Sequence, residues 1–167
     1  RLQGGVLVPF PDAAKAAGKK LLLVIHGTFS NSEALVTHGL QTRPLGRELL
    51  QAAEGKYDLV LCFDHPTLSV SPMLNAFDLA ALLRPAPASV DIVCHSRGGL
   101  VARWFCEAFA DAGLKRRVVF VGAPLGGTSL AAAPSLKNAL DLLTNVADAL
   151  RGAGDSVASS AFFTATS

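Results

Sequence analysis

Charged side chains are scarce in this chain, since only 17% of its 167 residues are Asp, Glu, Lys or Arg, against about a quarter in an average soluble protein. Fifteen basic and 13 acidic residues leave a formal net charge of +2. This balance argues against a nucleic-acid-binding protein and against a long disordered tail.

Long apolar runs are also missing. The stretch from Leu21 to Ile25 is far shorter than the roughly 20 residues that span a bilayer, so no transmembrane segment is predicted.

Cysteine is also sparse, and its three copies do not make a disulfide framework. Cys62 and Cys94 lie in apolar runs and Cys106 lies in a helix-like stretch, so all three are expected to be small buried residues. CxxC and HxxxH spacings do not occur, and neither a metal nor another cofactor is expected. This cysteine usage and the lack of a signal-peptide pattern predict a cytoplasmic protein. The start at Arg1 instead of Met favours a segment of a longer polypeptide with additional domains.

Half of the residues are hydrophobic, which is enough for the core of one domain over residues 1–167. Four short apolar runs alternate with stretches of helical period. This order predicts a three-layer α/β fold, in which a mostly parallel sheet has helices on both faces. The predicted strands are 21–25, 57–63, 90–94 and 117–121, the first and third being neighbours, and the predicted helices are 32–53, 72–83 and 99–112. The residues Ser30 to Glu33 predict a capping box for the first helix, and Ser71 with Pro72 predicts the start of the second.

The segment from Cys94 to Gly99 carries the strongest chemical signal. It reads Cys-His-Ser-Arg-Gly-Gly and lies between a predicted strand and a predicted helix. A serine on such a sharp turn presents its hydroxyl at the carboxyl edge of the sheet, and its neighbours must be small. Ser96 is therefore the candidate nucleophile, and the N–H of Arg97 is a candidate oxyanion-hole donor. The alternative is that Ser96 only caps the helix.

A second signal, His26-Gly27-Thr28-Phe29, directly follows the first predicted strand. Glycine lets the backbone approach a substrate closely, so the N–H of Thr28 or of Phe29 is the expected second donor of an oxyanion hole. His26 is expected to hold this loop by a hydrogen bond rather than to transfer a proton. Thr28 and Ser96 should then lie at the same edge of the sheet.

The segment from Gly122 to Ser129 reads GAPLGGTS and follows the fourth predicted strand. It is similar to the Gly-Ser/Thr-Pro-x-x-Gly-Ser/Thr segment that follows the strand after the nucleophile in bacterial lipases. With the two motifs above, it occurs in the order found in the lipases and esterases of the α/β-hydrolase fold, which the chain therefore resembles. A phosphate-binding loop is the other interpretation of this segment, but no lysine follows the glycines.

The resemblance implies a serine hydrolase that acts on lipid or other small-molecule esters through an acyl-enzyme on Ser96. It gives supporting roles to His26, Gly27 and His95. Cys94 departs from the pattern, which has glycine or alanine there, and this departure implies a slightly different turn. His95 is expected to point away from the pocket, because successive residues of the turn cannot both face it.

No histidine follows His95, although the α/β-hydrolase fold places an acid and then a histidine after the nucleophile. The visible strands look like the third to sixth of the family's eight. The acid and the base are therefore expected beyond residue 167, and the visible segment alone is expected to be inactive. His65 follows the second predicted strand, roughly 10 Å from the serine strand, and is expected to line the pocket or cap a turn.

Residues 129–151 contain an amphipathic stretch whose apolar face consists of Leu136, Leu140, Leu143, Val146 and Leu150. Lipases carry an insertion above the active site at this point, so the stretch is interpreted as a lid or cap helix, although a helix packed permanently on the sheet needs the same stripe. Two hypotheses for the function stay open. The chain is either a serine hydrolase or a non-catalytic hydrolase-like module that binds or regulates within a larger protein.

Overall fold

The computed structural model describes residues 1–128. Residues Arg1–Leu125 form one compact unit, and Gly126 begins a second. The strands are β1 (Leu2–Gln3), β2 (Val6–Leu7), β3 (Lys20–Ile25), β4 (Leu59–Phe63), β5 (Ser89–His95) and β6 (Lys115–Val121). The helices are α1 (Pro44–Lys56), α2 (Pro72–Leu82) and α3 (Gly98–Trp104), with a 3-10 turn η1 (Ala13–Ala16) and two π-helical segments, η2 (Ala34–Leu40) and η3 (Phe105–Phe109).

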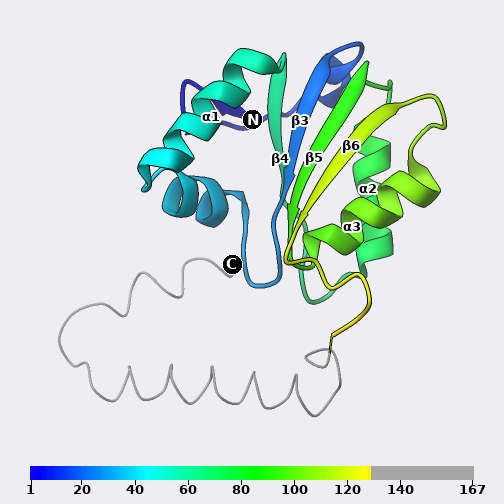
Figure 1. The fold of residues 1–167 in the computed structure, drawn as a ribbon. Helices are drawn as coiled ribbons and strands as arrows, with labels where there is room; N and C mark the ends of the chain where they lie inside the picture. Colours follow the sequence, from blue (N-terminus) through cyan, green and yellow to red (C-terminus); the bar gives the residue numbers. More distant parts are fainter. Residues whose placement is uncertain (129–167) are drawn as a thin grey trace, which may run out of the picture. The chain divides into compact units, whose positions relative to one another are not determined.

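Six strands form one mixed sheet in the order β2-β1-β4-β3-β5-β6 (Figure 1). The pairs β4–β3, β3–β5 and β5–β6 are parallel, as the alternation of strand and helix predicts. Ile25 is in register with both Phe63 and Cys94, and Cys94 with Phe120, one residue before the end of β6. The four parallel strands therefore end together, and the predicted adjacency of β3 and β5 is confirmed.

A short amino-terminal hairpin extends the sheet beyond β4. Its strands β1 and β2 pair antiparallel with each other, and Leu2 of β1 pairs antiparallel with Val60 of β4. The sequence analysis did not predict this hairpin, because strands of two residues are too short to show an alternating pattern.

The helices differ from the sequence expectation at three places. The predicted helix 99–112 is α3 followed by η3, and it ends at Phe109. The stretch 32–53, predicted as one helix, is divided into η2 and α1 by a turn before Pro44, because the residue before a proline is disfavoured in helical conformation. The capping box predicted at Ser30 is wrong, since the side chain that accepts the Ala34 N–H at 2.7 Å belongs to Asn31. The predicted start of α2 is confirmed, with the Ser71 hydroxyl accepting the Leu74 N–H at 3.3 Å.

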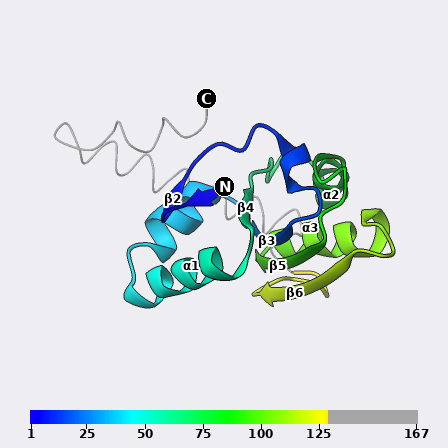
Figure 2. The same ribbon diagram turned by 90° about the horizontal axis from the view of Figure 1, so that it is seen from above.

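The helices cover both faces of the sheet, with α1 on one side and α2 and α3 on the other (Figures 1 and 2). Alternate residues of β3 divide between the two layers, since Leu21 and Leu23 join the core under α2 and α3 while Leu22 packs with the α1 cluster around Leu50. This arrangement is a three-layer α/β fold. None of the helices in the described part of the chain is long and apolar enough to cross a membrane.

Candidate functional site

Ser96 lies on a tight turn between β5 and α3, and its backbone has a left-handed φ of 50°. Such a conformation is uncommon outside glycine and costs free energy, so it persists only where the surroundings enforce it. The Ser96 N–H donates to the carbonyl of Val121 at the end of β6, at 2.9 Å. The hydroxyl is partly exposed and forms no hydrogen bond within residues 1–128.

The alternative interpretation of Ser96 as a helix cap does not agree with the geometry. The residue at the cap position of α3 is Arg97, and its side chain forms no capping hydrogen bond. The Ser96 carbonyl accepts the Gly99 N–H at 3.0 Å, which is a turn closed by the backbone alone. The Ser96 hydroxyl is therefore not used to start the helix. Residues 95–98 are called the serine turn below.

Glycines around the serine turn allow three segments to meet. A Cβ on Gly98 would lie 2.5 Å from the carbonyl oxygen of His26, and a Cβ on Gly99 would lie 2.3 Å from the Cβ of Ala123. Both distances are shorter than any real Cβ contact, so larger residues would force the backbone apart. The two glycines thus pack the start of α3 against the end of β3 on one side and against the loop after β6 on the other.

The loop after β3, residues 26–29, approaches the serine turn at Gly27. A Cβ on Gly27 would lie 2.9 Å from the Cβ of Ser96 and 3.0 Å from Nδ1 of His95. Because Ile25 is in register with Cys94, the two segments leave the sheet at the same edge. The structure therefore brings together the two motifs that the sequence analysis treats as one site, and residues 26–29 are called the β3 loop below.

The backbone donors of these segments are not equivalent. The Phe29 N–H already donates to the hydroxyl of Thr67, with an N···O distance of 3.4 Å. Within residues 1–128, neither the Thr28 N–H nor the Arg97 N–H donates a hydrogen bond. Of the two donors that the sequence leaves open in the β3 loop, Thr28 is thus the one whose N–H is unused, together with that of Arg97.

His26, the first residue of the β3 loop, is buried, with 2% of its surface exposed. Its Nδ1–H donates to the carbonyl of Gly27 at 2.9 Å, and its Nε2 accepts the backbone N–H of His65 at 3.3 Å. These two backbone partners place the ring proton on Nδ1. The ring thus links the β3 loop to the loop after β4, and neither nitrogen is directed to the Ser96 hydroxyl.

His65 is also buried, and its ring stacks on that of His26 with 4.2 Å between centroids and on that of Phe63 with 5.4 Å. Burial, and after it the neighbouring His26, lowers the pKa of His65 from 6.5 to about 4. A neutral, stacked ring of this kind supports the loop, and no hydrogen bond joins it to Ser96. The exposed His38 lies on η2.

His95 contacts the β3 loop. It is exposed, and its Nδ1 packs beside Gly27. The reason is that Gly27 has no side chain and leaves space for both the His95 ring and Ser96 Cβ. No hydrogen bond connects any histidine of the described part with the Ser96 hydroxyl.

The loop after β4, residues 64–71, is hydrogen-bonded to several segments of the site. The sequence analysis did not predict most of these contacts. Asp64 accepts the Ser32 N–H at 2.7 Å, the Arg97 guanidinium donates to the carbonyl of Val70, and the fully buried Asn75 donates to the carbonyl of Pro66 at 3.0 Å. With Thr67, these bonds connect the loop to the β3 loop, the serine turn and α2. The only signal in the sequence was the Asp64-His65-Pro66 segment at the end of a strand. Residues 64–71 are called the β4 loop below.

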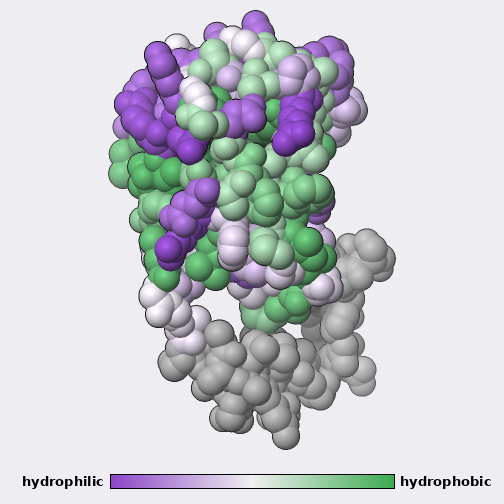
Figure 3. All heavy atoms as spheres, turned by 90° about the vertical axis from the view of Figure 1, so that its right-hand side faces the viewer, coloured by the Kyte–Doolittle hydropathy of each residue, from purple (hydrophilic) through white to green (hydrophobic). Residues whose placement is uncertain are grey.

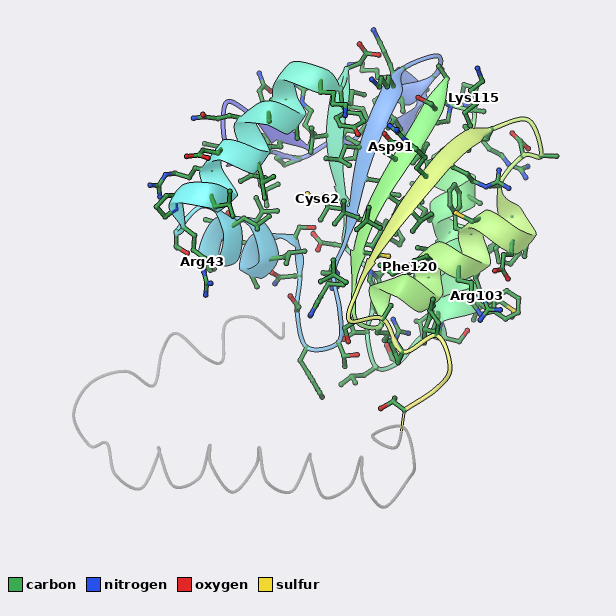
Figure 4. All side chains as sticks on the ribbon, in the orientation of Figure 1. Arg43, Cys62, Asp91, Arg103, Lys115 and Phe120 are labelled. Carbon is green, nitrogen blue, oxygen red and sulfur yellow. The ribbon has the colours of Figure 1, made fainter. Side chains whose placement is uncertain are left out.

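Cys94, the departure from the lipase-like pattern, is accommodated without exposing its thiol. The side chain is fully buried, its Sγ lies 3.4 Å from the carbonyl oxygen of Val119, and burial raises the pKa of the thiol to about 12. Its strand partner Phe120 points towards the helices of the same face (Figure 4).

The three cysteines are free, and the described residues contain no cluster of three or more His, Cys, Asp or Glu that could hold a metal ion.

The loop after β6 contains two residues with left-handed backbone, Gly122 with φ 57° and Gly127 with φ 94°. Both are glycine, which adopts this conformation at little cost. Ser129, at the end of this motif, and the amphipathic stretch 129–151 lie outside the described residues.

The surface on the side of α2, α3 and β6 is divided by polarity (Figure 3). Most of its strongly hydrophilic residues lie towards the amino ends of the strands, and the half nearer the carboxyl edge is more apolar. Exposed apolar side chains of the segments at the carboxyl edge are Phe29, Leu68, Met73, Leu74 and Leu125.

Comparison with known protein families gives a match over most of the chain. Residues 7–165 match the family described as a domain of unknown function, DUF7379. No curated protein and no solved structure matches the chain. Since the match covers nearly the whole sequence, the chain belongs to the DUF7379 family.

Proposed function

We propose that this domain is the nucleophile-bearing part of a serine hydrolase with an α/β-hydrolase fold, acting on carboxylic esters of lipid or other acyl groups. The observation that carries the proposal is the left-handed Ser96, with its hydroxyl unused, packed against Gly27 of the neighbouring loop. Strained residues of this kind cluster at active sites, where the strain fixes a reacting group.

The position of the serine in the sheet supports the same function. Ser96 follows the carboxyl end of β5, which has parallel neighbours on both sides, and this edge is where open α/β sheets bind ligands. The order β4-β3-β5-β6, with an antiparallel hairpin beyond β4, agrees with the resemblance to the α/β-hydrolase fold. The start of α3 behind the serine adds a partial positive charge.

In the proposed reaction, the Ser96 Oγ attacks the acyl carbonyl carbon and its proton passes to a base. The carbonyl oxygen becomes an oxyanion, which accepts hydrogen bonds from the N–H groups of Thr28 and Arg97. Collapse of the tetrahedral intermediate expels the alcohol and leaves an acyl-enzyme. The base gives the Ser96 proton to the departing alcohol oxygen. In the second half of the reaction the base takes a proton from water, the hydroxide attacks the acyl-enzyme, and the base passes this proton to the Ser96 Oγ as the acid is released.

No histidine of the described residues is hydrogen-bonded to the Ser96 hydroxyl. His26 has both ring nitrogens bonded to backbone groups, and His65 is stacked in the interior. The histidine base and its acid partner are proposed to come from sequence beyond residue 167. The lack of a histidine hydrogen-bonded to Ser96 within residues 1–128 favours a second candidate, a hydrolase-like binding module that has lost its base.

Ester turnover by the complete native polypeptide, with and without Ser96→Ala, separates the two candidates. The hydrolase should turn over p-nitrophenyl esters, and Ser96→Ala should reduce kcat by up to about 10⁶-fold. A polypeptide ending at residue 167 should be essentially inactive. A folded complete protein without turnover, or with turnover unchanged in Ser96→Ala, would favour the binding module.

A further inference from the structure

Phe29 combines two unfavourable features. Its backbone is left-handed, with φ 56°, and its side chain is 58% exposed. Among residues 1–128, only Phe29 and Ser96 adopt a positive φ without being glycine. A bulky aromatic residue is a genuine outlier in this region, where glycine or asparagine would fit with less strain.

Thr67 holds Phe29 in this conformation. The Phe29 N–H donates to the Thr67 hydroxyl at 3.4 Å, and the β4 loop that carries Thr67 is anchored by the buried Asn75 through the carbonyl of Pro66. The next residue, Leu68, is 62% exposed. The hydrogen bond between residues 29 and 67 therefore brings two exposed apolar side chains, Phe29 and Leu68, onto neighbouring loops.

These features occur beside the unused donor of the site. Thr28, whose N–H is free within the described residues, directly precedes Phe29 in the β3 loop. Since Phe29 is the next residue in the chain, its exposed side chain borders the backbone donor that would bind a substrate carbonyl. An exposed Phe alone is common on protein surfaces, but a Phe that also costs backbone strain at this position is not explained by folding.

We propose that Phe29 is a specificity-determining residue that contacts the apolar acyl chain of the ester, and that Thr67 is a positioning residue that holds Phe29 in place. The substrates would carry medium or longer alkyl chains, since an acetyl group is too short to cover the ring. This inference rests on the proposed hydrolase function.

The test compares two substitutions at one position in the complete native polypeptide. Phe29→Gly removes the ring and relieves the left-handed strain, whereas Phe29→Leu keeps an apolar side chain and keeps the strain. Turnover of p-nitrophenyl octanoate and acetate is measured for both variants. Phe29→Gly should lower kcat/KM for octanoate at least about tenfold and for acetate less than threefold, and Phe29→Leu should stay close to wild type on both esters.

Thermal unfolding distinguishes this role from a structural one. Phe29→Gly should unfold at the same temperature as wild type or a few degrees higher, because a strained residue becomes glycine. Thr67→Val should raise KM for octanoate with kcat nearly unchanged, and Thr67→Ser, which keeps the hydroxyl, should behave like wild type.

Equal kcat/KM ratios for octanoate and acetate in wild type and Phe29→Gly would overturn the inference, as would equal losses in Phe29→Gly and Phe29→Leu. Failure of the proposed function has a different signature. In that case, Ser96→Ala would leave the turnover of both esters unchanged, and the inference about Phe29 would fall with it.

Discussion

A Cβ atom on Gly27 would lie 2.9 Å from the Cβ of Ser96, so the β3 loop and the serine turn touch where only glycine fits. Two segments that are 69 positions apart in the sequence are thereby held at one edge of the sheet. The same contact leaves room for the ring of His95, and Thr28 is the next residue in the β3 loop.

Gly27→Ala should separate the two segments. The added methyl group has to displace Ser96 or the His95 carbonyl oxygen, which is 3.2 Å from the same point, so we expect a loss of about 1–3 kcal/mol in the free energy of unfolding. Displacement of the Thr28 donor should lower kcat about 100-fold or more. Urea unfolding and ester turnover measure the two effects.

Gly55→Ala is the matched control for this substitution. Gly55 lies in α1, and a Cβ on it would meet nothing within 4 Å. Alanine is the better helix former, so this variant should gain up to about 1 kcal/mol and retain activity. A Gly27→Ala variant as stable and active as Gly55→Ala would show that the close contact has no consequence.

Ser96→Gly should stabilise the fold while it abolishes turnover. Glycine adopts the observed φ of 50° without strain, so the free energy of unfolding should rise by about 0.5–1 kcal/mol relative to Ser96→Ala, which keeps the strained backbone. Differential scanning calorimetry of the two variants measures the difference. A Ser96→Gly variant less stable than Ser96→Ala would show that the turn is not strained.

Protonation of His65 should destabilise the fold in acid. Its pKa is lowered from 6.5 to about 4, first by burial and then by His26, so the unfolded chain binds a proton before the folded one does. The contribution of His65 to stability is therefore complete above pH 6.5 and is lost as the pH falls from there through about 4. His65→Phe keeps the stacking and should remove this part of the pH dependence in urea unfolding.

His38→Gln is the control for that experiment, because His38 is exposed on η2. It should leave the pH dependence of the wild type unchanged. Identical pH profiles for wild type and His65→Phe between pH 6.5 and 4 would contradict the buried, neutral state of His65.

Asp91 contributes to stability at a place remote from the site, in the amino-terminal half of β5 (Figure 4). Its carboxylate accepts hydrogen bonds from the Arg117 guanidinium and from the Tyr57 hydroxyl, the latter at 2.7 Å, and these partners lower its pKa from 3.8 to about 2. The lowered pKa gives stability that is present above pH 4 and is lost as the pH falls through about 2.

Asp91→Asn should therefore lower the free energy of unfolding by roughly 1 kcal/mol at neutral pH, a value reduced by the exposure of Arg117 to solvent. The variant should also lose less stability than wild type as the pH falls from 4 to 2. Ester turnover should not change. Asp78→Asn, exposed on α2 and without an ion pair in the described part of the chain, should alter neither quantity. Equal acid limbs in wild type and Asp91→Asn would contradict the assignment.

The parallel sheet could be predicted because its strands are short runs of consecutive apolar residues, such as Leu21 to Ile25, separated by stretches of helical period. Ser96 and Gly27 could be related before the structure because each lies two residues after the end of such a run. Local patterns of this kind also predicted Ser71 as the start of α2.

Contacts between segments that are distant in the sequence could not be predicted from local patterns. Nothing local to Thr67 indicates that its hydroxyl accepts the Phe29 N–H, and nothing local to Asn75 indicates that it anchors the β4 loop. The choice of Thr28 over Phe29 as the unused donor also depends on that non-local bond. The contact of His95 with the β3 loop could not be predicted for a related reason, since the space that its ring occupies is created by Gly27 of another segment.

Covalent labelling by a fluorophosphonate tests the central claim most directly. The complete native polypeptide is treated with the probe, digested, and analysed by mass spectrometry to locate the modified residue. A serine hydrolase with the proposed site should carry the phosphonyl group on the peptide that contains Ser96, and Ser96→Ala should abolish the labelling. Labelling of another residue, or no labelling of a protein shown to be folded, would contradict the assignment of Ser96 as the nucleophile.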